Sequence, residues 1–479
     1  MKNSVITWPA PAGEPSSPDY TLEVNGMPVF VYPARVRSEI LRQKGLWTHR
    51  PNCAAERASF ALFDVDGSVT VTVRPMRPFR TAAVLPARAG IQPDVKDGCV
   101  RFSLAEPRHL TLTLDGDDSA PLHLFVGEPE GQPRRRDDPN ILFFGPGLHT
   151  LRRLPVRSGQ IVYLAGGAVL RAALNPDEKG TFSEKWNVMF YPGAVFDIHN
   201  AENVRICGRG ILDGSLMPHP ACNLIRIADS QDVSVEGIVL RDAPNWNCII
   251  QRSRNVRVDD LRIVSGRLNS DGINSVNSQA VRIRRCFVRN HDDSIVVKTI
   301  EPAPPAEDIR VEDCVIWNDW GYALGVTYET RAAVRAVRFH RCDILFARHW
   351  CMGIHASDSA TVSDVSFSDI SVDELAMAHA AKDAYAALTP EPKLLRLAIV
   401  RDVWGNDPEP GHIRGVSVEN VNVTGERLPT SEILGFNDEH AVENVRIRGV
   451  RLRGCSPAAD AAALGLRVNA HVRDIRIEP

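Results

Sequence analysis

Three segments that follow one another at intervals of 28 residues decide the fold: AVRIRRCFV (280–288), DIRVEDCVI (308–316) and AVRFHRCDI (336–344). In each, apolar and polar residues alternate over a short run, a polar step follows, and a second apolar run completes the unit. The same pattern recurs in both directions along the chain. Its leading apolar residues are Val204, Val233, Val256, Val281, Ile309, Val337, Val365, Val416, Val445 and Val472.

The leading residues are 29, 23, 25, 28, 28, 28, 51, 29 and 27 positions apart. A period of this length, built from β-branched strands with little helical periodicity, is typical of one coil of a parallel β-helix. Such coils stack about 4.8 Å apart and bury a continuous core. The interval of 51 indicates one coil with a long insertion, or two coils of which one is degenerate. A leucine-rich repeat has a similar period, but its LxxLxLxxN pattern does not occur.

A second column is predicted five residues after each leading residue. It contains three cysteines among aliphatic residues, which favours small buried thiols over a redox or metal role. The ten cysteines show no spacing of metal-ligand type, and no metal site or cofactor is predicted. The column consists of Ile238, Leu261, Cys286, Cys314, Cys342, Ile370, Val421 and Val450.

Residues 1 to about 135 lack the repeat. Alternating segments such as TLEVNGMPVFVYP (21–33), with Gly, Pro and Asp at the turns, predict an antiparallel β-sandwich. We therefore expect a sandwich over 1–135 and a β-helix over 136–479, with about ten repeated coils and the first coils in 141–200. The Ala-rich run LAMAHAAKDAYAALTP, inside the departure from the repeat at 374–412, favours a helix that walls a cleft.

The formal net charge of −3, from 56 basic and 59 acidic residues, does not indicate a nucleic-acid surface. No stretch approaches the roughly 18 apolar residues of a membrane span. Residues 1–20 contain no apolar run of signal-peptide type. The compartment stays open between the cytoplasm and a secreted or periplasmic form without its leader, and the oligomeric state is not indicated.

Three aspartates lie in successive repeats, in the segments NSDGIN (269–274) and NHDDSIVVK (290–298). Adjacent coils bring Asp271 and Asp293 to about 5 Å at the backbone, with Asp292 beside them. Clustered carboxylates repel one another, so one pKa is expected to rise, which yields an acid and a base for hydrolysis. Turn-capping aspartates or a Ca²⁺ site are the alternatives. The alignment predicts an inward column of Ile249, Ile273, Ile295 and Leu324, and beside it Asn247, Asp271, Asp293 and Tyr322.

The runs ILDGS (211–215), APNWN (243–247), NSDGIN and HDDSIVVK resemble glycoside hydrolase family 28, the polygalacturonase family, over roughly residues 190–375. The resemblance implies a right-handed parallel β-helix and inverting hydrolysis of glycosidic bonds. It implies Asp292 as the general acid, with Asp271 and Asp293 activating the water.

Two motifs depart from that family. Its GHG segment corresponds here to Gly321-Tyr322-Ala323, and its RIK segment to Gly353-Ile354-His355. The Arg and Lys of RIK bind the uronate carboxylate in the family, so we expect a largely neutral oligo- or polysaccharide instead. Family 49, the dextranases and isopullulanases, is similar in keeping three aspartates on a β-helix behind a sandwich, and the architecture looks closer to it. Pectin hydrolysis, a lyase or epimerase, and a non-catalytic glycan-binding β-helix are the alternatives.

Other side chains near the aspartates are candidates for substrate binding, the aromatic ones by stacking on sugar rings. Trp350 is a further aromatic candidate, and Glu329 with Arg331 is interpreted as a surface pair, with the rim of a subsite as the alternative. The predicted substrate-binding residues are Trp246, Asn247, His291, Lys298, Trp320, Tyr322, His349 and His355.

Overall fold

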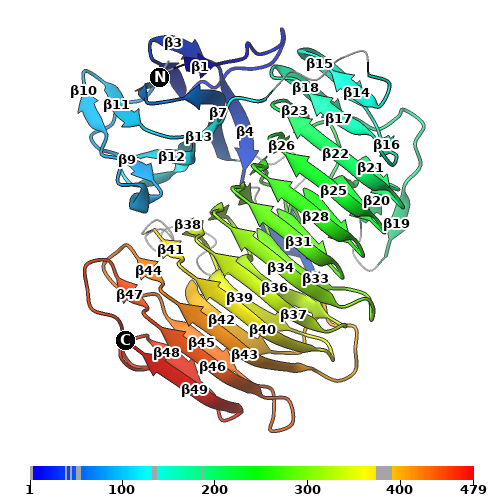
Figure 1. Ribbon diagram of the computed structural model, residues 1–479, viewed down its shortest axis with the longest axis vertical. Helices are drawn as coiled ribbons and strands as arrows, with labels where there is room; N and C mark the ends of the chain where they lie inside the picture. The colour runs from blue at the N-terminus through cyan, green and yellow to red at the C-terminus, as the bar shows by residue number, and fades with distance from the viewer. Residues whose placement is uncertain are drawn as a thin grey trace.

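The computed structural model describes residues 4–37, 40–43, 46–49, 56–131, 138–184, 188–373 and 391–479. Three long parallel sheets form a right-handed parallel β-helix, and antiparallel sheets precede it, which confirms the predicted fold class. The sandwich, in blue, lies beside the β-helix, whose strands run from cyan to red (Figure 1). Within these ranges, no helix is long and apolar enough to cross a membrane.

Two sheets with a shared apolar core form the sandwich. The first contains β1 (Ser4–Ile6), β4 (Val31–Val36), β7 (Glu56–Asp66), β9 (Ala82–Leu85), β12 (His109–Leu114) and β13 (Asp117–Gly127). The second contains β2 (Tyr20–Val24), β3 (Met27–Val29), β8 (Val69–Pro75), β10 (Asp94–Lys96) and β11 (Cys99–Leu104). All pairs are antiparallel except β13 with β7. The hairpin β5 (Ile40–Gln43)–β6 (Leu46–His49) and the 3₁₀ turn η1 (Ala87–Ala89) complete this part, and the boundary predicted at residue 135 lies outside the described residues.

Each coil of the β-helix contributes a strand to each of three sheets, here called sheets I, II and III. Sheet I contains β14 (Ile141–Phe144), β17 (Ile161–Leu164), β22 (Glu202–Gly208), β25 (Gln231–Glu236), β28 (Arg254–Asp259), β31 (Gln279–Arg284), β34 (Ala306–Glu312), β37 (Val334–His340), β40 (Thr361–Ser368), β43 (His412–Glu419), β46 (Val442–Arg448) and β49 (Val472–Glu478). Sheet II contains β15 (Gly147–Leu151), β18 (Ala168–Ala172), β23 (Ile211–Asp213), β26 (Val239–Arg241), β29 (Arg262–Val264), β32 (Phe287–Asn290), β35 (Val315–Asn318), β38 (Asp343–Ala347), β41 (Ser371–Val372), β44 (Asn422–Val423) and β47 (Arg451–Leu452). Sheet III contains β16 (Leu154–Val156), β21 (Ala194–His199), β24 (Asn223–Ala228), β27 (Cys248–Gln251), β30 (Ile273–Val276), β33 (Ile295–Thr299), β36 (Tyr322–Thr330), β39 (Trp350–Ala356), β42 (Lys393–Ile399), β45 (Ser431–Leu434) and β48 (Leu466–Val468), and the hairpin β19 (Thr181–Ser183)–β20 (Val188–Phe190) lies outside the three sheets.

The leading residues of the repeat pair with one another in register along sheet I, from Val204 to Val445. Val365 pairs directly with Val416, so the interval of 51 is one coil with an insertion. The predicted last member is wrong, because Val445 pairs with Ile475 and Val472 pairs with Val442. Both residues of HVRDIRI satisfy the alternation, so the pattern alone does not distinguish them. The helix predicted at 375–390 lies outside the described residues.

The polar step of the repeat is the turn between sheets I and II. One residue there has a left-handed backbone, such as Asp260 (φ 56°), Asp313 (φ 56°) and Asn420 (φ 56°). Asn and Asp tolerate this conformation better than other residues with a Cβ atom. The residue that follows begins the second column, and all eight members of that column are at most 3% exposed. The three cysteines are therefore buried core side chains, as predicted.

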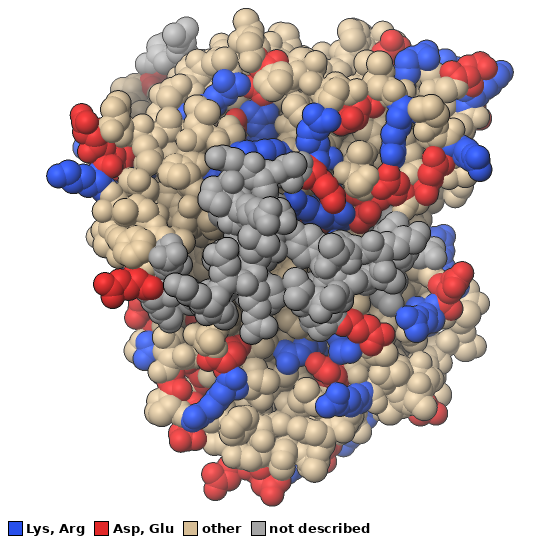
Figure 2. All heavy atoms as spheres, turned by 180° about the vertical axis from the view of Figure 1, so that it is seen from behind, with Lys and Arg blue, Asp and Glu red and all other residues tan. Residues whose placement is uncertain are grey.

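The sandwich packs on the outer face of sheet II. Phe60 and Phe125 from the sandwich share an apolar cluster with Phe287 and Trp317 from the β-helix. Gly266, after β29, allows close approach, because a Cβ there would lie 2.3 Å from Val36 Cα. Figure 2 shows Lys and Arg side chains interspersed with Asp and Glu on one face of the molecule, without a field of a single sign.

Candidate active site

The three aspartates lie where the chain passes from sheet II to sheet III. Asp271 precedes β30, and Asp292 and Asp293 precede β33 in the next coil. Gly272 N donates to Asp293 O at 2.9 Å, which keeps the two turns stacked. One carboxylate oxygen of each aspartate lies within 4.8 Å of the others. The structure thus brings together the residues predicted as catalytic, in a group whose chemistry also suits a divalent cation.

The predicted register is wrong by one residue in the preceding coil. Cys248, not Ile249, pairs with Ile273. The alternation does not separate the two candidates, because Cys248 and Ile249 are both apolar and both buried. Asn247 is consequently fully buried, and its amide donates to the carbonyl oxygen of Asp271 at 3.0 Å. It supports the turn that holds Asp271.

Two further asparagines hold the turn that carries Asp292 and Asp293. Asn290 Nδ2 donates to the carbonyl oxygens of Asp292 at 2.9 Å and Asp293 at 2.8 Å. Asn318 Nδ2, from the next coil, donates to Asp292 O at 2.7 Å and to Ser294 Oγ at 2.8 Å. The backbone position of both aspartates is therefore fixed from two coils.

Asp293 accepts hydrogen bonds at both carboxylate oxygens. Tyr322 N donates to Oδ1 at 3.0 Å, while Thr327 Oγ1 and Lys298 Nζ donate to Oδ2 at 2.8 Å and 3.0 Å. These three donors, one of them cationic, hold the carboxyl group of Asp293 in one orientation. The sequence analysis predicted Lys298 near the site but missed Thr327, which lies 34 residues from Asp293.

Lys298 lies between Asp293 and Glu329, whose Oε2 is 3.4 Å from Nζ. Burial lowers the pKa of Lys298, but Glu329, Asp293 and Asp271 outweigh it and hold the pKa above its usual value. Pairing between β33 and β36 shifts after Val297, because Tyr328 and Glu329 form a bulge. Bulges re-aim side chains beside functional sites. The predicted surface pair is wrong, because Arg331 pairs with Asp407 at 2.9 Å instead of with Glu329.

Two of the three carboxyls, those of Asp271 and Asp292, have raised pKa values. Burial and then Asp293 raise the pKa of Asp292 to about 7, against the opposing charge of Lys298. Burial and then Asp292 raise the pKa of Asp271 well above its usual range, although Lys298 and the amide of Asn274 oppose this. Asn274 Nδ2 donates to Asp271 Oδ2 at 2.8 Å. The cluster therefore places Asp292, which keeps a proton available near neutral pH, beside an Asp293 side chain that is fixed by three donors.

Two predicted histidines lie behind the cluster as neutral rings. Burial lowers the pKa of His291 to about 4 and that of His349 to about 3. His291 Nδ1 lies 3.1 Å from Gly266 O, and Gly321 N donates to His349 Nδ1 at 3.4 Å. Trp320 is partly exposed and lies over His349, with ring centroids 4.2 Å apart. Of these three side chains, Trp320 presents the most surface toward a ligand.

A polar chain continues along sheet III beyond the aspartates. Asp402 Oδ2 lies 2.6 Å from His355 Nε2, and Arg396 Nη1 donates to His355 Nδ1 and to Tyr322 Oη, both at 2.9 Å. Arg396 Nε also donates to Glu432 Oε1 at 2.8 Å. Arg396 was not predicted from the sequence, because the long insertion separates β42 from the repeat that precedes it.

Tyr322 is fully buried, so its ring is not available for stacking on a sugar. It supports the partly exposed Trp350 instead, with ring centroids 4.4 Å apart and planes at 27°. Gly353 makes room for it, because a Cβ there would lie 2.7 Å from Tyr322 Cε1. On the other side of the aspartates, the partly exposed Trp246 has its ring centroid 5.7 Å from Lys298 Nζ. Two indole faces therefore flank the cluster.

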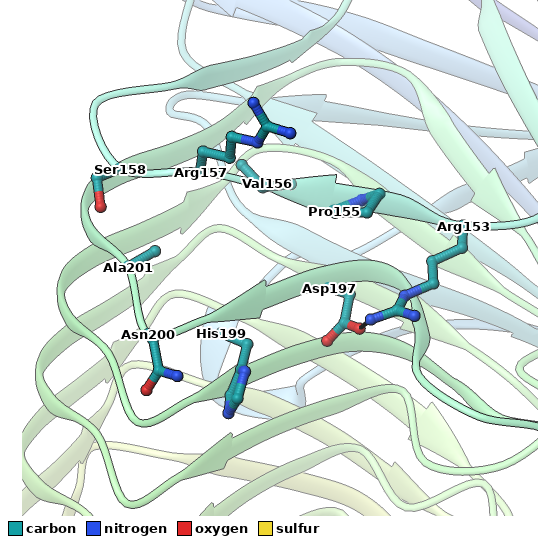
Figure 3. Close-up of a pocket in the computed structure, with 9 residues that line it drawn as sticks. All are labelled: Arg153, Pro155, Val156, Arg157, Ser158, Asp197, His199, Asn200 and Ala201. Atoms are coloured by element: carbon teal, nitrogen blue, oxygen red, sulfur yellow. Dashed lines mark hydrogen bonds and ion pairs between the residues drawn. The ribbon is translucent and has the colours of Figure 1, made fainter.

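A separate hollow of about 330 Å³ lies on the first strands of sheet III (Figure 3). Arg153 points to Asp197 across it, and Arg226 also pairs with Asp197, with Nε 2.8 Å from the carboxylate. Its lining contains no Trp, Tyr or Phe side chain, and its carboxylate is already paired, so the aspartate cluster is the better candidate site. The hollow is lined by Arg153, Pro155, Val156, Arg157, Ser158, Asp197, His199, Asn200 and Ala201.

The fold and the carboxylate cluster define a class, the parallel β-helix proteins that resemble glycoside hydrolases. Residues 177–392 match the family model described as glycosyl hydrolases family 28. A probable polygalacturonase from Vitis vinifera is 28% identical over 136 residues, which cover 27% of this chain and 24% of that relative. The match thus spans about a quarter of the relative's length.

One solved structure extends the likeness of the fold to the whole chain. Dex49A from Penicillium minioluteum is 12% identical, with a TM-score of 0.62 over 100% of this chain and 99% of that chain. This likeness shows the shared fold. An exopolygalacturonase from Thermotoga maritima is 16% identical, with a TM-score of 0.49 over 71% of this chain and 83% of that chain. The predicted resemblance to family 28 in its motifs and to family 49 in its architecture is confirmed.

Proposed function

We propose that the protein is an inverting glycoside hydrolase that cleaves O-glycosidic bonds in a largely neutral oligo- or polysaccharide. The observation that carries this proposal is the carboxylate cluster, in which three aspartates lie within 4.8 Å of one another at the edge of sheet III. Such a group costs electrostatic free energy when buried, and acid–base hydrolysis uses the divided protonation that results.

In this mechanism Asp292 is the general acid. It is the partly exposed member of the group, and its pKa of about 7 keeps a proton available at neutral pH for the leaving oxygen. Asp293, fixed by Tyr322 N, Thr327 and Lys298, accepts the proton of the attacking water, and Asp271 helps to activate that water by orienting it.

Two observations bear on whether hydrolysis inverts or retains the anomeric configuration, and they point in opposite directions. Carboxyl separations of roughly 6.5–9.5 Å are typical of inverting enzymes and about 5–5.5 Å of retaining ones, and the separation here is within 4.8 Å. Inversion is supported by the family resemblance and by Asp293, whose two oxygens already accept three hydrogen bonds. A carboxylate engaged in this way is better suited to act on water than to attack the anomeric carbon. Proton NMR of the first products separates the two mechanisms, because retention of the anomer would exclude ours.

A neutral substrate is supported by the charges that surround the aspartates. Lys298 is paired with Asp293 and Glu329, and Arg396 is paired with Glu432. Neither cation has an unpaired charge to offer a uronate. The partly exposed faces of Trp246 and Trp350 suit the apolar face of a sugar ring.

The test is a screen of dextran, pullulan, polygalacturonate, arabinan and fructan for release of reducing ends, with Asp292→Asn as the inactive control. We expect cleavage of a neutral glycan by the wild type alone. Preferred cleavage of polygalacturonate would establish the pectin alternative, which the family model and the Vitis vinifera relative favour. An unsaturated product that absorbs in the ultraviolet would indicate a lyase, and binding without cleavage would indicate a glycan-binding protein.

A further inference from the structure

An arginine of the N-terminal sandwich reaches the turn that follows β35, next to the turn that carries Asp292. Arg37 directly follows β4, and its Nε donates to Asp319 Oδ1 at 2.6 Å. The Asp319 side chain is fully buried and that of Arg37 is 10% exposed. The two residues are 282 positions apart, so this ion pair exists only because the sandwich is docked on sheet II.

Both neighbours of Asp319 in the sequence contact Asp292. Asn318 Nδ2 donates to Asp292 O at 2.7 Å, and Trp320 forms an isolated antiparallel bridge with Asp292. Asp319 N itself donates at 2.9 Å to the carbonyl oxygen of Asn290, whose amide also donates to Asp292 O. A displacement of the 318–320 turn therefore moves three contacts to Asp292 or to its support.

We propose that Arg37 is a positioning residue, which clamps Asp319 and thereby holds the 318–320 turn against Asp292. This inference rests on the proposed function, in which Asp292 is the general acid. With this role for Arg37, the sandwich is part of the framework that positions the active site. If the sandwich were an independent binding module, the loss of Arg37 would leave the chemical step unchanged.

The geometry of Arg37 is specific to a guanidinium. Its three nitrogen atoms each contact a different carboxylate, because Nη1 donates to Glu56 Oε2 at 3.0 Å and Nη2 donates to Asp118 Oδ2 at 2.5 Å. The cation also lies over the ring of Phe346, 4.9 Å from its centroid. A lysine would keep the charge, but its compact ammonium cannot reach all three carboxylates.

Asp319 accepts hydrogen bonds from both the sandwich and the β-helix. Its other oxygen accepts from Arg289 Nε at 3.1 Å, and Trp317 Nε1 donates to Oδ1 at 3.1 Å. Burial raises the pKa of Asp319, but Arg289 and Arg37 outweigh it and hold the pKa below its usual range. The buried carboxylate is thus kept charged by one cation from each part of the molecule.

The chain offers a matched control on the same strand. Arg35, within β4, also crosses from the sandwich to the β-helix, where its Nε donates to Asp242 Oδ2 at 2.8 Å. Asp242 lies after β26, in the coil before that of Asp271, and Arg35 is 51% exposed. A substitution of Arg35 therefore removes a contact between the same two parts without touching the 318–320 turn, and Asp242 keeps its second cation, Arg267, whose Nε donates to Oδ1 at 2.9 Å.

The experiment compares Arg37→Lys with Arg35→Lys in the full-length protein. The first measurements are kcat, KM and the unfolding midpoint. The pKa of Asp292 is then measured by ¹³C NMR of aspartate-labelled protein, with the signal assigned through Asp292→Asn. The groups that face Asp292 are Asp271 before β30, Asp293 in its own turn, Lys298 on β33 and Tyr328 on β36. None of these changes charge in Arg37→Lys, so a shift reports geometry and hydration.

We expect Arg37→Lys to lower kcat about a hundredfold with KM unchanged, because a small displacement of an acid has a large effect on the chemical step. We expect the pKa of Asp292 to fall by about one unit toward its ordinary value as water enters the loosened turn. Arg35→Lys is expected to leave kcat and this pKa unchanged. A kcat and an Asp292 pKa equal to those of the wild type in Arg37→Lys overturn the proposal, as does an equal loss in both variants.

Arg37→Met is a harsher variant, because it leaves Asp319, Asp118 and Glu56 without their shared cation. Where it fails to fold, Arg37→Lys decides the question. If the wild type cleaves no glycan, the proposed function fails, and the NMR titration still decides whether Arg37 positions Asp292.

Discussion

Two stacks of like residues on neighbouring coils differ in what they cost the fold. Cys286, Cys314 and Cys342 are fully buried, and burial raises the pKa of Cys314 well above its usual range, which keeps the thiol neutral. Asp271 and Asp293 are stacked by the same coil repeat, but their carboxylates repel one another and lose hydration. The thiols fill the core without an electrostatic cost. The carboxyls of the aspartates need hydrogen-bond donors, which are Asn274 on β30, Lys298 on β33, and Tyr322 and Thr327 on β36. A cluster of carboxyls that lowers stability and is nonetheless held by several hydrogen bonds is expected to have a functional role.

The largest expected effect follows from removal of the acid. Asp292→Asn should lower kcat about a thousandfold, because the leaving oxygen then departs without a proton. The unfolding midpoint should not fall, since a neutral amide replaces a carboxyl whose ionised form burial and the neighbouring Asp293 disfavour. Initial rates on the glycan found in the screen and urea unfolding check both parts. Activity equal to that of the wild type would exclude Asp292 as the acid.

A second substitution separates the charge balance from the acid. Lys298→Met leaves Asp293 and Glu329 without their shared cation, so the free energy of unfolding should fall by about 3 kcal/mol and activity should be lost. Urea unfolding measures the loss. The control is Lys393→Met, which removes a cation whose partner, Glu391, is 54% exposed. This substitution should lower the free energy of unfolding by less than about 1 kcal/mol. Equal losses of unfolding free energy in the two variants would contradict the conclusion that Lys298 balances the buried charges of the cluster.

The pH dependence of stability distinguishes the carboxylates from the thiols below pH 8. Because the pKa of Asp292 is raised to about 7, the folded protein binds more protons than the unfolded chain between the unfolded pKa, about 4, and the folded one. This contribution to stability is present at low pH and falls as pH rises through that window, by up to about 1.4 kcal/mol per unit. Urea unfolding of the wild type and Asp292→Asn from about pH 4 to pH 8 should give curves that diverge. Parallel curves would show that the pKa of Asp292 is ordinary.

The smallest effect is expected in the thiol column. Cys314→Ala removes one buried sulfur atom from the core and should lower the free energy of unfolding by about 1 kcal/mol. Because the thiol is neutral and faces the interior, kcat should stay at the wild-type value. Thermal unfolding and initial rates check this, and a loss of activity would show that the core column and the aspartate cluster are coupled.

The local repeat made most of the β-helix predictable. The alternation in NVRVDDLRI or AVRIRRCFV specifies which side chains face inward, and stacking of identical units then follows from burial. The prediction failed where two residues satisfied the same pattern, at Cys248 and Ile249 and again at Val472 and Ile475. In both places the register depends on the neighbouring coil, which the local pattern does not contain.

The aspartates were predictable because their motifs lie within about one period of each other, and because a family resemblance assigned them roles. Their environment was not. Thr327 and Glu329 reach Asp293 and Lys298 only because a bulge interrupts β36, and Arg396 reaches Tyr322 only across a long insertion.

The amino-acid sequence alone was sufficient for the coil, the buried thiols and the meeting of three aspartates, because each follows from periodicity over one or two repeats. Only the tertiary structure revealed the pairing of Lys298 with Glu329, the buried support that Tyr322 provides to Trp350, and the reach of Arg37 to Asp319. The Lys298–Glu329 and Arg37–Asp319 contacts join side chains that the repeat does not relate. Tyr322 and Trp350 are in register on adjacent coils, but which of the two rings is buried depends on the packing around them. Two of these contacts, the Lys298–Glu329 and Arg37–Asp319 ion pairs, place charged side chains near the turn that carries Asp292, and the pattern of a single coil does not specify either pair.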